Sequence, residues 1–422
     1  MTDLNDAKVL VVGSGISAKG AENALKRRKI CCIAAEKDEA AKLLRKQAFD
    51  LVVVSPSIPL GDAIFGMAEE RGIRTVGEIE LGYMLFDGVI AAVTGTNGKT
   101  TVSKMLALML SARYKTELCG NIGKSFALTA AEGECEAAVV EVSSFQLETI
   151  RAFHPHVAII TNISEDHLDR HANMENYAAL KKRIAANQTK EDTLVLSQDG
   201  IPLKYLTDFS PAAHVIFACA RGKIDGAYMD GGKFYYYDEY IASEDNLPFR
   251  EKFNYGNFLL AASAARAMGV SCGEIRRSMA DFKPEPHRLA LIRVLNGVNF
   301  YDDSKATNVG AALAALGEMQ GSVCLIAGGS EKNCGYEKLF STRAQLCKLN
   351  LIGRTKRKIR DAAYIGGFSN VELFDTLDKA VKNAYESGCR NVLFSPACAS
   401  FDMFENYAER GERFAEIVNA LV

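Results

Sequence analysis

Residues 93–101, Val93-Thr94-Gly95-Thr96-Asn97-Gly98-Lys99-Thr100-Thr101, indicate how this chain folds and what it binds. They follow the apolar run 89–93 and lead into residues with the apolar spacing of a helix. Glycines at such a turn let backbone N–H groups approach phosphate oxygens, Lys99 supplies a charge for the β and γ phosphates, and the Thr100 hydroxyl is placed for magnesium. The full phosphate-loop pattern has its first glycine where Val93 stands. We therefore predict a shortened loop that binds a nucleoside triphosphate.

Short β-rich apolar runs recur along the chain, each followed by glycine or serine and then a helical stretch. Strands that alternate with helices predict an α/β fold with parallel sheets. In such sheets ligands bind beyond the carboxyl ends of the strands, which is where the polar clusters of this sequence fall. The predicted strands are 9–12, 51–54, 89–93, 138–142, 157–160, 323–327 and 391–394.

The length of 422 residues predicts roughly three domains of about 150 residues each. We place one boundary near Gly88 and another in 282–288, where Pro284 and Pro286 stop any helix. The predicted domains are therefore 1–88, 89–283 and 284–422.

Composition limits the possible partners and the cellular location. The formal net charge is −2 with acidic and basic residues interspersed, so we expect small-molecule partners and neither nucleic acid nor a membrane surface. Eleven cysteines without a CxxC pair favour reduced thiols over a disulfide framework. No apolar run is long enough to span a bilayer, and we expect a soluble, cytoplasmic protein.

A second nucleotide motif lies near the N-terminus. Gly13-Ser14-Gly15-Ile16-Ser17-Ala18 follows a strand and opens a helix, and Glu36 comes about twenty residues later, as in the dinucleotide-binding fingerprint. Alone, the motif favours a dehydrogenase; the glycines could also serve only strand-to-helix packing, or bind another nucleotide such as a UDP-sugar. A phosphate loop elsewhere in the chain favours the UDP-sugar.

Acidic and histidine side chains follow two further strands. Glu141 ends an apolar strand and is our candidate to complete the magnesium shell of the phosphate loop. The cluster 161–171 combines ligands for hard cations with imidazoles, and we predict that His167 binds a second metal ion. By composition the basic segment 177–184 is a solvated helix face, and nothing local distinguishes one of its lysines.

Three polar clusters lie beyond the proline-rich linker: 287–288, 302–308 and 327–332. The last can bring backbone amides and a lysine toward an anion. A fourth segment, 395–402, ends the last strong strand. The glycines of a nucleophile elbow are missing there, so we expect Ser395 and Cys398 to cap or pack rather than to act as nucleophiles.

Taken together, these segments resemble the Mur ligases, the ATP-dependent amide ligases that build the peptide of the bacterial cell wall. The family resemblance rests on 94–100, Gly120-Asn121-Ile122-Gly123, 141–148 and 162–170. Segments 303–308 and 395–402 resemble the branch that adds D-glutamate to UDP-N-acetylmuramoyl-L-alanine. The matches span nearly the whole chain in the right order.

The resemblance implies a Rossmann-like N-terminal domain for the uridine nucleotide, a central ATPase domain and a Rossmann-like C-terminal domain, with ATP and two Mg2+ ions as cofactors. We expect a monomer. Lys99, Thr100 and Glu141 would hold the phosphates and the first magnesium, and His167 the second. Lys181, four residues after Tyr177, matches the lysine that the family carbamylates with CO2 to give a magnesium ligand.

The resemblance also implies the remaining substrate contacts. The implied ATP contacts are Asn257, Arg288 and Asp303; those to the UDP-muramoyl substrate are Ser14, Gly15, Ile16, Ser17, Glu36 and Asn121; those to D-glutamate are Lys305, Thr307, Lys332, Ser400, Phe401 and Tyr407. Two residues depart from the family pattern: Ser57 replaces a usual glycine and Phe253 a usual histidine.

Three alternatives remain open at this stage. A sister ligase or folylpolyglutamate synthase would add another amino acid, and segments 305–308 and 395–402 discriminate against it. A nicotinamide oxidoreductase would rest only on 13–18 and Glu36. A non-enzymatic nucleotide switch would leave the second metal cluster and the C-terminal basic pocket unexplained.

Overall fold

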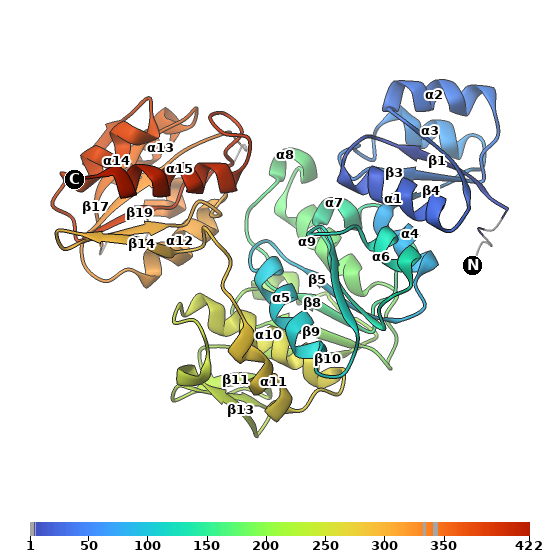
Figure 1. Cartoon of the computed structure of the whole chain (residues 1–422), viewed down its shortest axis with the longest axis horizontal. Helices are drawn as coiled ribbons and strands as arrows, with labels where there is room; N and C mark the ends of the chain where they lie inside the picture. Colours follow the sequence, from blue (N-terminus) through green and yellow to red (C-terminus); the bar gives the residue numbers. More distant parts are fainter. Residues whose placement is uncertain (1–3, 5, 332–334, 341–344) are drawn as a thin grey trace. The chain divides into compact units, whose positions relative to one another are not determined.

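A computed structural model of the chain describes residue 4 and residues 6–331, 335–340 and 345–422 (Figure 1). The described strands form three sheets, and the chain packs into two compact units. Unit 1 comprises Met1–Ile163, Glu175–Arg250 and Asn254–Phe282, and unit 2 comprises Ser164–Met174, Glu251–Phe253 and Lys283–Val422. The sheets are rich in parallel pairs with helices between the strands, which confirms the predicted α/β class.

The first sheet of unit 1 has four parallel strands in the order β2-β1-β3-β4. Val9 and Val11 of β1 pack with α1 and α4 on one face, and Leu10 and Val12 pack with α2 and α3 on the other. Because both faces are covered, the central strands β1 and β3 are nearly continuous buried apolar runs. The elements are β1 (Lys8–Val12), β2 (Cys31–Ala35), β3 (Leu51–Val54), β4 (Arg74–Gly77), α1 (Ile16–Arg27), α2 (Lys37–Lys46), α3 (Ala63–Glu69) and α4 (Glu78–Leu85).

The second sheet of unit 1 has nine strands in the order β13-β12-β11-β10-β9-β8-β5-β7-β6. Pairs from β6 to β11 are parallel, and β12 and β13 extend one edge as antiparallel strands. Since β5 lies between β7 and β8, the loops that follow these three strands meet at one edge of the sheet. The strands are β5 (Val89–Thr94), β6 (Thr116–Gly120), β7 (Ala137–Glu141), β8 (Val157–Ile160), β9 (Thr193–Ser197), β10 (His214–Cys219), β11 (Gly226–Asp230), β12 (Lys233–Tyr236) and β13 (Glu239–Ser243).

Helices α5, α10 and α11 cover one face of the nine-stranded sheet, where they pack against Val93 and Val139. The helices that follow the strands of this sheet are α5 (Lys99–Leu110), α6 (Phe126–Glu132), α7 (Ser144–Leu147), α9 (Met174–Lys182), α10 (Phe253–Ala267) and α11 (Cys272–Ser278), with short 3-10 turns at Arg183–Ala185, Leu203–Tyr205, Glu244–Asn246 and Met279–Asp281.

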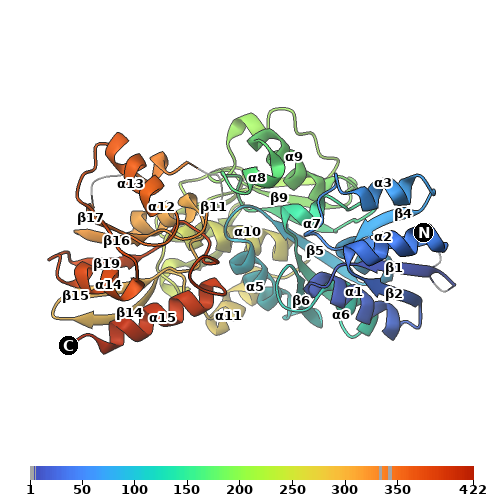
Figure 2. The same cartoon turned by 90° about the horizontal axis from the view of Figure 1, so that it is seen from above.

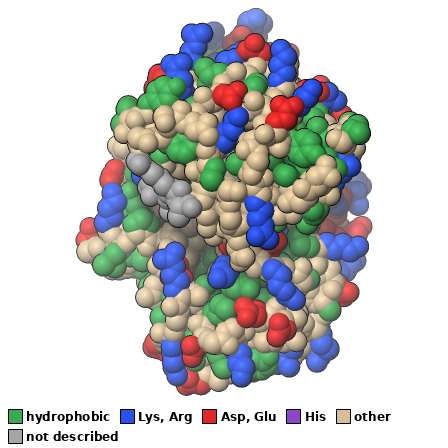
Figure 3. Space-filling model, turned by 90° about the vertical axis from the view of Figure 1, so that its left-hand side faces the viewer, with side chains coloured by type: hydrophobic (Ala, Val, Ile, Leu, Met, Phe, Trp, Pro, Cys, Tyr) green, Lys and Arg blue, Asp and Glu red, His purple; other side chains and the backbone are tan. Residues whose placement is uncertain are grey.

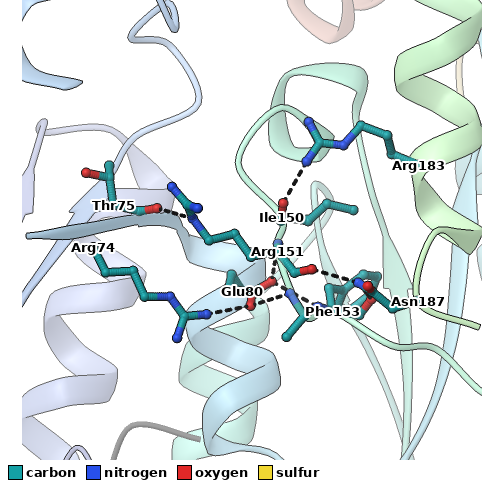
Figure 4. A network of polar contacts seen from close by, with 9 residues as sticks. Arg74, Thr75, Glu80, Ile150, Arg151, Phe153, Arg183 and Asn187 are labelled. Atoms are coloured by element: carbon teal, nitrogen blue, oxygen red, sulfur yellow. Dashed lines mark hydrogen bonds and ion pairs between the residues drawn. The ribbon is translucent and has the colours of Figure 1, made fainter. Parts of the chain in front are cut away.

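A buried carboxylate joins the two sheets of unit 1 (Figure 4). Glu80 of α4 is fully buried and accepts hydrogen bonds from the N–H groups of Arg151, Ala152 and Phe153 at 2.7–3.0 Å and from Arg74 at 3.3 Å. Arg183 and Asn187 donate to carbonyls of the same loop. These hydrogen bonds offset the free energy that is lost when the carboxylate is removed from water. The residues before and after Gly88 therefore belong to the same compact unit. The predicted domain ranges stay predictions.

The sheet of unit 2 has the order β14-β15-β19-β16-β17-β18, with β14 antiparallel to its neighbour. Side chains of β16 alternate between two cores: Leu325 packs with α12 and α13, and Ile326 packs with α14 and α15. Figure 2 shows α12 and α13 on one side of this sheet and α14 and α15 on the other. The elements are β14 (Ala290–Leu295), β15 (Val298–Asp302), β16 (Val323–Ala327), β17 (Leu346–Leu351), β18 (Val371–Leu373), β19 (Asn391–Phe394), α8 (Leu168–His171), α12 (Val309–Glu318), α13 (Lys356–Ile365), α14 (Leu377–Tyr385) and α15 (Tyr407–Ala420), with a 3-10 turn at Glu337–Phe340.

The surface carries charges of both signs. On the face drawn in Figure 3, lysine and arginine side chains alternate with aspartate, glutamate and hydrophobic ones. Within the described part of the chain, no helix combines the length and apolar character needed to cross a membrane.

Candidate active site

The phosphate loop connects β5 to α5 and depends on the conformational freedom of glycine. Gly95 has a φ of 148° and Gly98 a φ of 81°. A side chain at Gly98 would be strained and would also collide with the amide of Asn257. Gly98 is the N-cap of α5 and has no side chain to accept from the N–H groups of the first turn, which favours an anion at this helix end.

The loop is held by residues that follow the neighbouring strand β8. The Asn162 side chain accepts from the N–H of Asn97 at 2.9 Å, and the Thr161 hydroxyl donates to the carbonyl of Asn97 at 2.6 Å. Lys99 Nζ donates to the carbonyls of Gly95 and Thr96, each at 2.9 Å. The ammonium therefore lies over the loop, where a phosphate held by the backbone would meet it.

Thr100 and Glu141, predicted from separate segments, lie together. Thr100 Oγ1 donates to Glu141 Oε2 at 2.8 Å, and Asn121 Nδ2 donates to Glu141 Oε1 at 2.8 Å. Glu141 is only 2% exposed, at the end of β7 beside β5. Among the described residues no three His, Cys, Asp or Glu side chains gather as a metal cluster. A hydroxyl and one carboxylate nevertheless fit Mg2+, which keeps several waters and takes other ligands from substrate phosphates.

Lys181 is buried, contrary to the solvated helix face that composition predicts for 177–184. Its side chain is 1% exposed, Nζ donates to the carbonyl of Gly95 at 2.7 Å, and Nζ lies 4.3 Å from the ring centroid of Tyr177. Tertiary packing therefore buries one lysine of a basic helix beside the phosphate loop. The sequence signal that could have found it is the aromatic residue one helical turn earlier, because residues four apart share a helix face.

Helix α10 brings Asn257 to the phosphate loop, beside Gly98. Asn257 Nδ2 also donates to Asn254 Oδ1 at 3.1 Å. Phe253, which stands where the family pattern has a histidine, belongs to unit 2, and its N–H donates to Glu318 at 3.2 Å.

His167 belongs to unit 2, whereas Thr100 and Glu141 belong to unit 1. The carboxylate of Asp166 accepts from the N–H of His167 at 2.9 Å and from Asn308 Nδ2 at 3.2 Å. Asn308 also caps α12 through its Oδ1, which accepts from Ala311. The segment that carries the second predicted metal ligand is thus tied to the loop 303–308. No local sequence pattern indicates this link, because 142 residues separate Asp166 from Asn308.

Arg288 and Asp303 both belong to unit 2, and the positive charge of Arg288 acts on the Asp303 carboxyl. Burial raises the pKa of Asp303 to about 7, against the hydrogen bond from Ser395 and the positive charge of Arg288, which lower it. Ser395 Oγ donates to Asp303 at 2.7 Å, and the N–H of Leu289 donates to it at 3.2 Å. Among the described residues, Arg288 Nε is buried without a hydrogen-bond partner. Such an orphaned donor suits a ligand oxygen.

The predicted amino-acid pocket contains a carboxylate that the sequence analysis missed. Lys305 Nζ donates to Glu285 at 2.7 Å, and the two side chains are 12% and 7% exposed. The same ammonium lies 5.4 Å from the ring centroid of Tyr407. Ser400 is buried and Phe401 is 76% exposed. Thr307, two residues after Lys305, is partly exposed, and Lys332 lies outside the described residues.

The N-terminal loop 13–18 presents an exposed helix start. Ser14, Gly15 and Ile16 are exposed at the beginning of α1, and Glu36 is exposed after β2. Ser57 Oγ lies 3.0 Å from Ser55 Oγ in the neighbouring loop. An uncapped helix start beside hydroxyl groups suits a pyrophosphate.

Three comparisons place the chain among known proteins. The profile of the Mur ligase middle domain matches residues 93–265. A UDP-N-acetylmuramoylalanine--D-glutamate ligase of Lachnospira eligens is 39% identical, over 99% of this chain and 100% of the relative. A pseudomurein peptide ligase type C from Methanothermus fervidus shares the fold, with a TM-score of 0.63, 18% identity and coverage of 98% and 99% of the two chains. The MurF ligase from Thermotoga maritima, solved in complex with ADP, has a TM-score of 0.58, 16% identity and coverage of 89% and 95%.

Proposed function

Since this chain belongs to the Mur ligase family, we propose that it is an ATP-dependent ligase that joins D-glutamate to UDP-N-acetylmuramoyl-L-alanine in peptidoglycan precursor synthesis. The observation that carries the proposal is the 39% identity to a D-glutamate ligase over essentially both complete chains. The contacts around the phosphate loop support it, since they hold a lysine, a hydroxyl and a carboxylate where a triphosphate with Mg2+ would need them.

We propose three functional domains, 1–88, 89–283 and 284–422, for the uridine nucleotide, ATP and the amino acid. Segment 95–101 and Asn257 would bind ATP, and we propose the same role for Arg288 and Asp303. The UDP-muramoyl substrate would take Ser14, Gly15, Ile16, Ser17, Glu36 and Asn121. D-Glutamate would take Lys305, Thr307, Lys332, Ser400, Phe401 and Tyr407. We further propose a monomer that works in the cytoplasm, where ATP is available.

Thr100 and Glu141 would hold one Mg2+ and His167 a second. Bound Mg2+ would neutralise charge on the transferring phosphoryl oxygens. We propose that Lys181 is carbamylated. Its burial supports this. The ammonium groups of Lys181 and Lys99 both donate to the Gly95 carbonyl, and two positive charges this close to each other in a buried position repel. Conversion to a carbamate would replace one of the two positive charges by a negative one.

The reaction must activate a carboxylate, because its oxygen is a poor leaving group toward an amine. In the proposed course the γ-phosphoryl of ATP passes to the L-alanyl carboxylate, which gives an acyl phosphate and ADP. The amine of D-glutamate then attacks the acyl carbon, and phosphate leaves. Lys99 stabilises charge on the phosphoryl oxygens and Asn121 orients the muramoyl substrate, so the chain contributes positioning and electrostatics and no covalent nucleophile.

Phosphate release tests the proposal directly. We expect the purified chain to release phosphate from ATP above background only when UDP-N-acetylmuramoyl-L-alanine and D-glutamate are both present. Replacement of D-glutamate by L-alanine, diaminopimelate or L-glutamate should restore background. Equal release with another amino acid would overturn the D-glutamate assignment, and NAD-dependent redox activity would overturn the ligase.

A further inference from the structure

Arg410 is one of the largest fully buried side chains of the described structure. It lies near the start of α15 and is 1% exposed. Its guanidinium donates through Nε to Ser304 Oγ at 3.0 Å, through Nη2 to the Ser304 carbonyl at 2.7 Å and through Nη1 to the Cys398 carbonyl at 3.1 Å. One side chain therefore joins the loop 303–308 to the loop 395–402.

All three of these acceptors are neutral oxygens. Burial lowers the pKa of Arg410 to about 10, although nearby negative groups that include Asp402 and Asp302 act in the opposite direction. Burial of a cation among neutral acceptors costs desolvation free energy. A guanidinium differs from other cationic side chains because its donors are held in a rigid, planar arrangement. The cost indicates that the geometry of the two loops matters to the protein.

The two loops carry the proposed D-glutamate contacts. Ser304 directly precedes Lys305, and Cys398 is two residues before Ser400. Ser304 Oγ also donates to the carbonyl of Tyr407 at 2.8 Å, which adds the start of α15 to the same cluster. Segments from three parts of the chain thus meet at Arg410 and Ser304.

We propose that Arg410 is a positioning residue for the amino-acid substrate, which acts through Ser304 and Cys398 without touching the substrate. This rests on the proposed function. Asp303, the proposed ATP contact in the same loop, also has anchors that do not involve Arg410, because its N–H donates to the Phe394 carbonyl of β19 at 2.8 Å and its carboxylate accepts from Ser395, directly after that strand, at 2.7 Å. Loss of Arg410 should therefore affect the amino acid more than ATP.

The test is Arg410→Lys, which keeps the charge and the aliphatic stem but cannot reproduce the three-donor fork. We expect KM for D-glutamate to rise at least about tenfold and KM for ATP to stay within about twofold. Arg413→Lys is the matched control: it is on the same helix, exposed, and paired with Asp378 and Glu416. Both Michaelis constants should stay within about twofold of wild type in the control.

An unchanged KM for D-glutamate, or equal rises for both substrates, would overturn the proposal. If Arg410→Lys fails to fold, Ser304→Ala keeps the two carbonyl bonds of Arg410 and should raise KM for D-glutamate by a smaller factor in the same direction. Hydrogen exchange provides a readout that needs no substrate: Arg410→Lys should speed exchange in 303–308 and 395–402, and Arg413→Lys in neither. Unchanged exchange overturns the positioning role, whereas a wild-type enzyme without D-glutamate-dependent phosphate release overturns the proposed function.

Discussion

The phosphate loop of unit 1 and the amino-acid pocket of unit 2 hold their lysines in different ways. Lys99 and Lys181 both donate to the carbonyl of Gly95, a neutral acceptor of the loop itself. Lys305 donates to the carboxylate of Glu285 in a mostly buried ion pair. A phosphate can attract an ammonium from a carbonyl at little cost, whereas a substrate carboxylate must compete with Glu285 for Lys305.

The difference separates two kinds of site. In the phosphate loop, strand ends and backbone fix the positions, and Lys99 and Lys181 supply positive charge beside the backbone carbonyl of Gly95. In the pocket, side chains also fix the positions, through Arg410 and the pair of Lys305 with Glu285. Removal of a charge should therefore stop the reaction at the loop, and only tune affinity or stability at the pocket.

The largest effect is expected from Lys99→Ala. We expect the fold to remain and ATP-dependent ligation to fall by at least about 10^3, because the carbonyls of Gly95 and Thr96 cannot replace the lost positive charge. Phosphate release under saturating substrates measures the loss. Lys104→Ala, on the same helix, is the control and should keep activity within about threefold. Retention of most activity by Lys99→Ala would break the comparison.

Glu141→Gln is expected to have the next largest effect. The amide oxygen can still accept from Thr100, but the negative charge that favours Mg2+ is lost. We expect kcat to fall about 100-fold and the Mg2+ concentration for half-maximal rate to rise. Titration of the rate with Mg2+ measures both. Glu117→Gln, exposed on the neighbouring strand β6, should change neither, and an unchanged Mg2+ requirement in Glu141→Gln would argue against a metal at this position.

The same contrast explains how much of the molecule could be predicted from its sequence. The phosphate loop, its strand and Glu141 carry local signals: an apolar run, glycines at a turn and an acidic residue at a strand end. Neighbouring parallel strands then bring these segments together. The α/β class and the loop geometry follow from short-range rules of this kind.

The remaining parts of the site depend on contacts between residues far apart in the chain. The burial of Lys181 comes from packing of the helix that carries it against the phosphate loop, and composition assigned this residue to a solvated face. Arg410 lies 106 residues from Ser304, and neither residue has a local pattern that points to the other. Glu285 lies between two prolines, which read only as a linker. Long-range pairing of polar side chains has no periodicity to detect.

Asp303→Asn tests whether buried charge makes the pocket region sensitive to pH. Burial raises the pKa of Asp303 to about 7, so the folded state holds a proton that the unfolded chain loses near pH 4. Wild-type stability should therefore fall as the pH rises from about 4 to about 7 and then level off. The upper limit is about 4 kcal/mol, and we expect about 2 kcal/mol because water that enters the loop reduces the penalty.

Denaturant unfolding at pH 5 and pH 8 measures this effect. The free energy of unfolding of Asp303→Asn minus that of wild type should be larger at pH 8 than at pH 5, because the amide carries no charge to bury. Asp361→Asn, exposed on α13, should show the same difference from wild type at both pH values. A pH-independent effect of Asp303→Asn would show that the carboxyl is ionised throughout.

The smallest effect is expected from Glu285→Gln. This variant tests most directly whether the pocket and the phosphate loop hold their lysines in different ways. The glutamine oxygen can still accept from Lys305, so the ammonium stays in place while its neutralising charge is removed. If Glu285 competes with a substrate carboxylate, KM for D-glutamate should fall about threefold, less than 1 kcal/mol, with KM for ATP unchanged. Lys305→Ala, measured in parallel, should raise KM for D-glutamate. A rise in KM for Glu285→Gln would mean that the ion pair positions Lys305 for binding, and the pocket would then resemble the phosphate loop in using a cation held ready for its ligand.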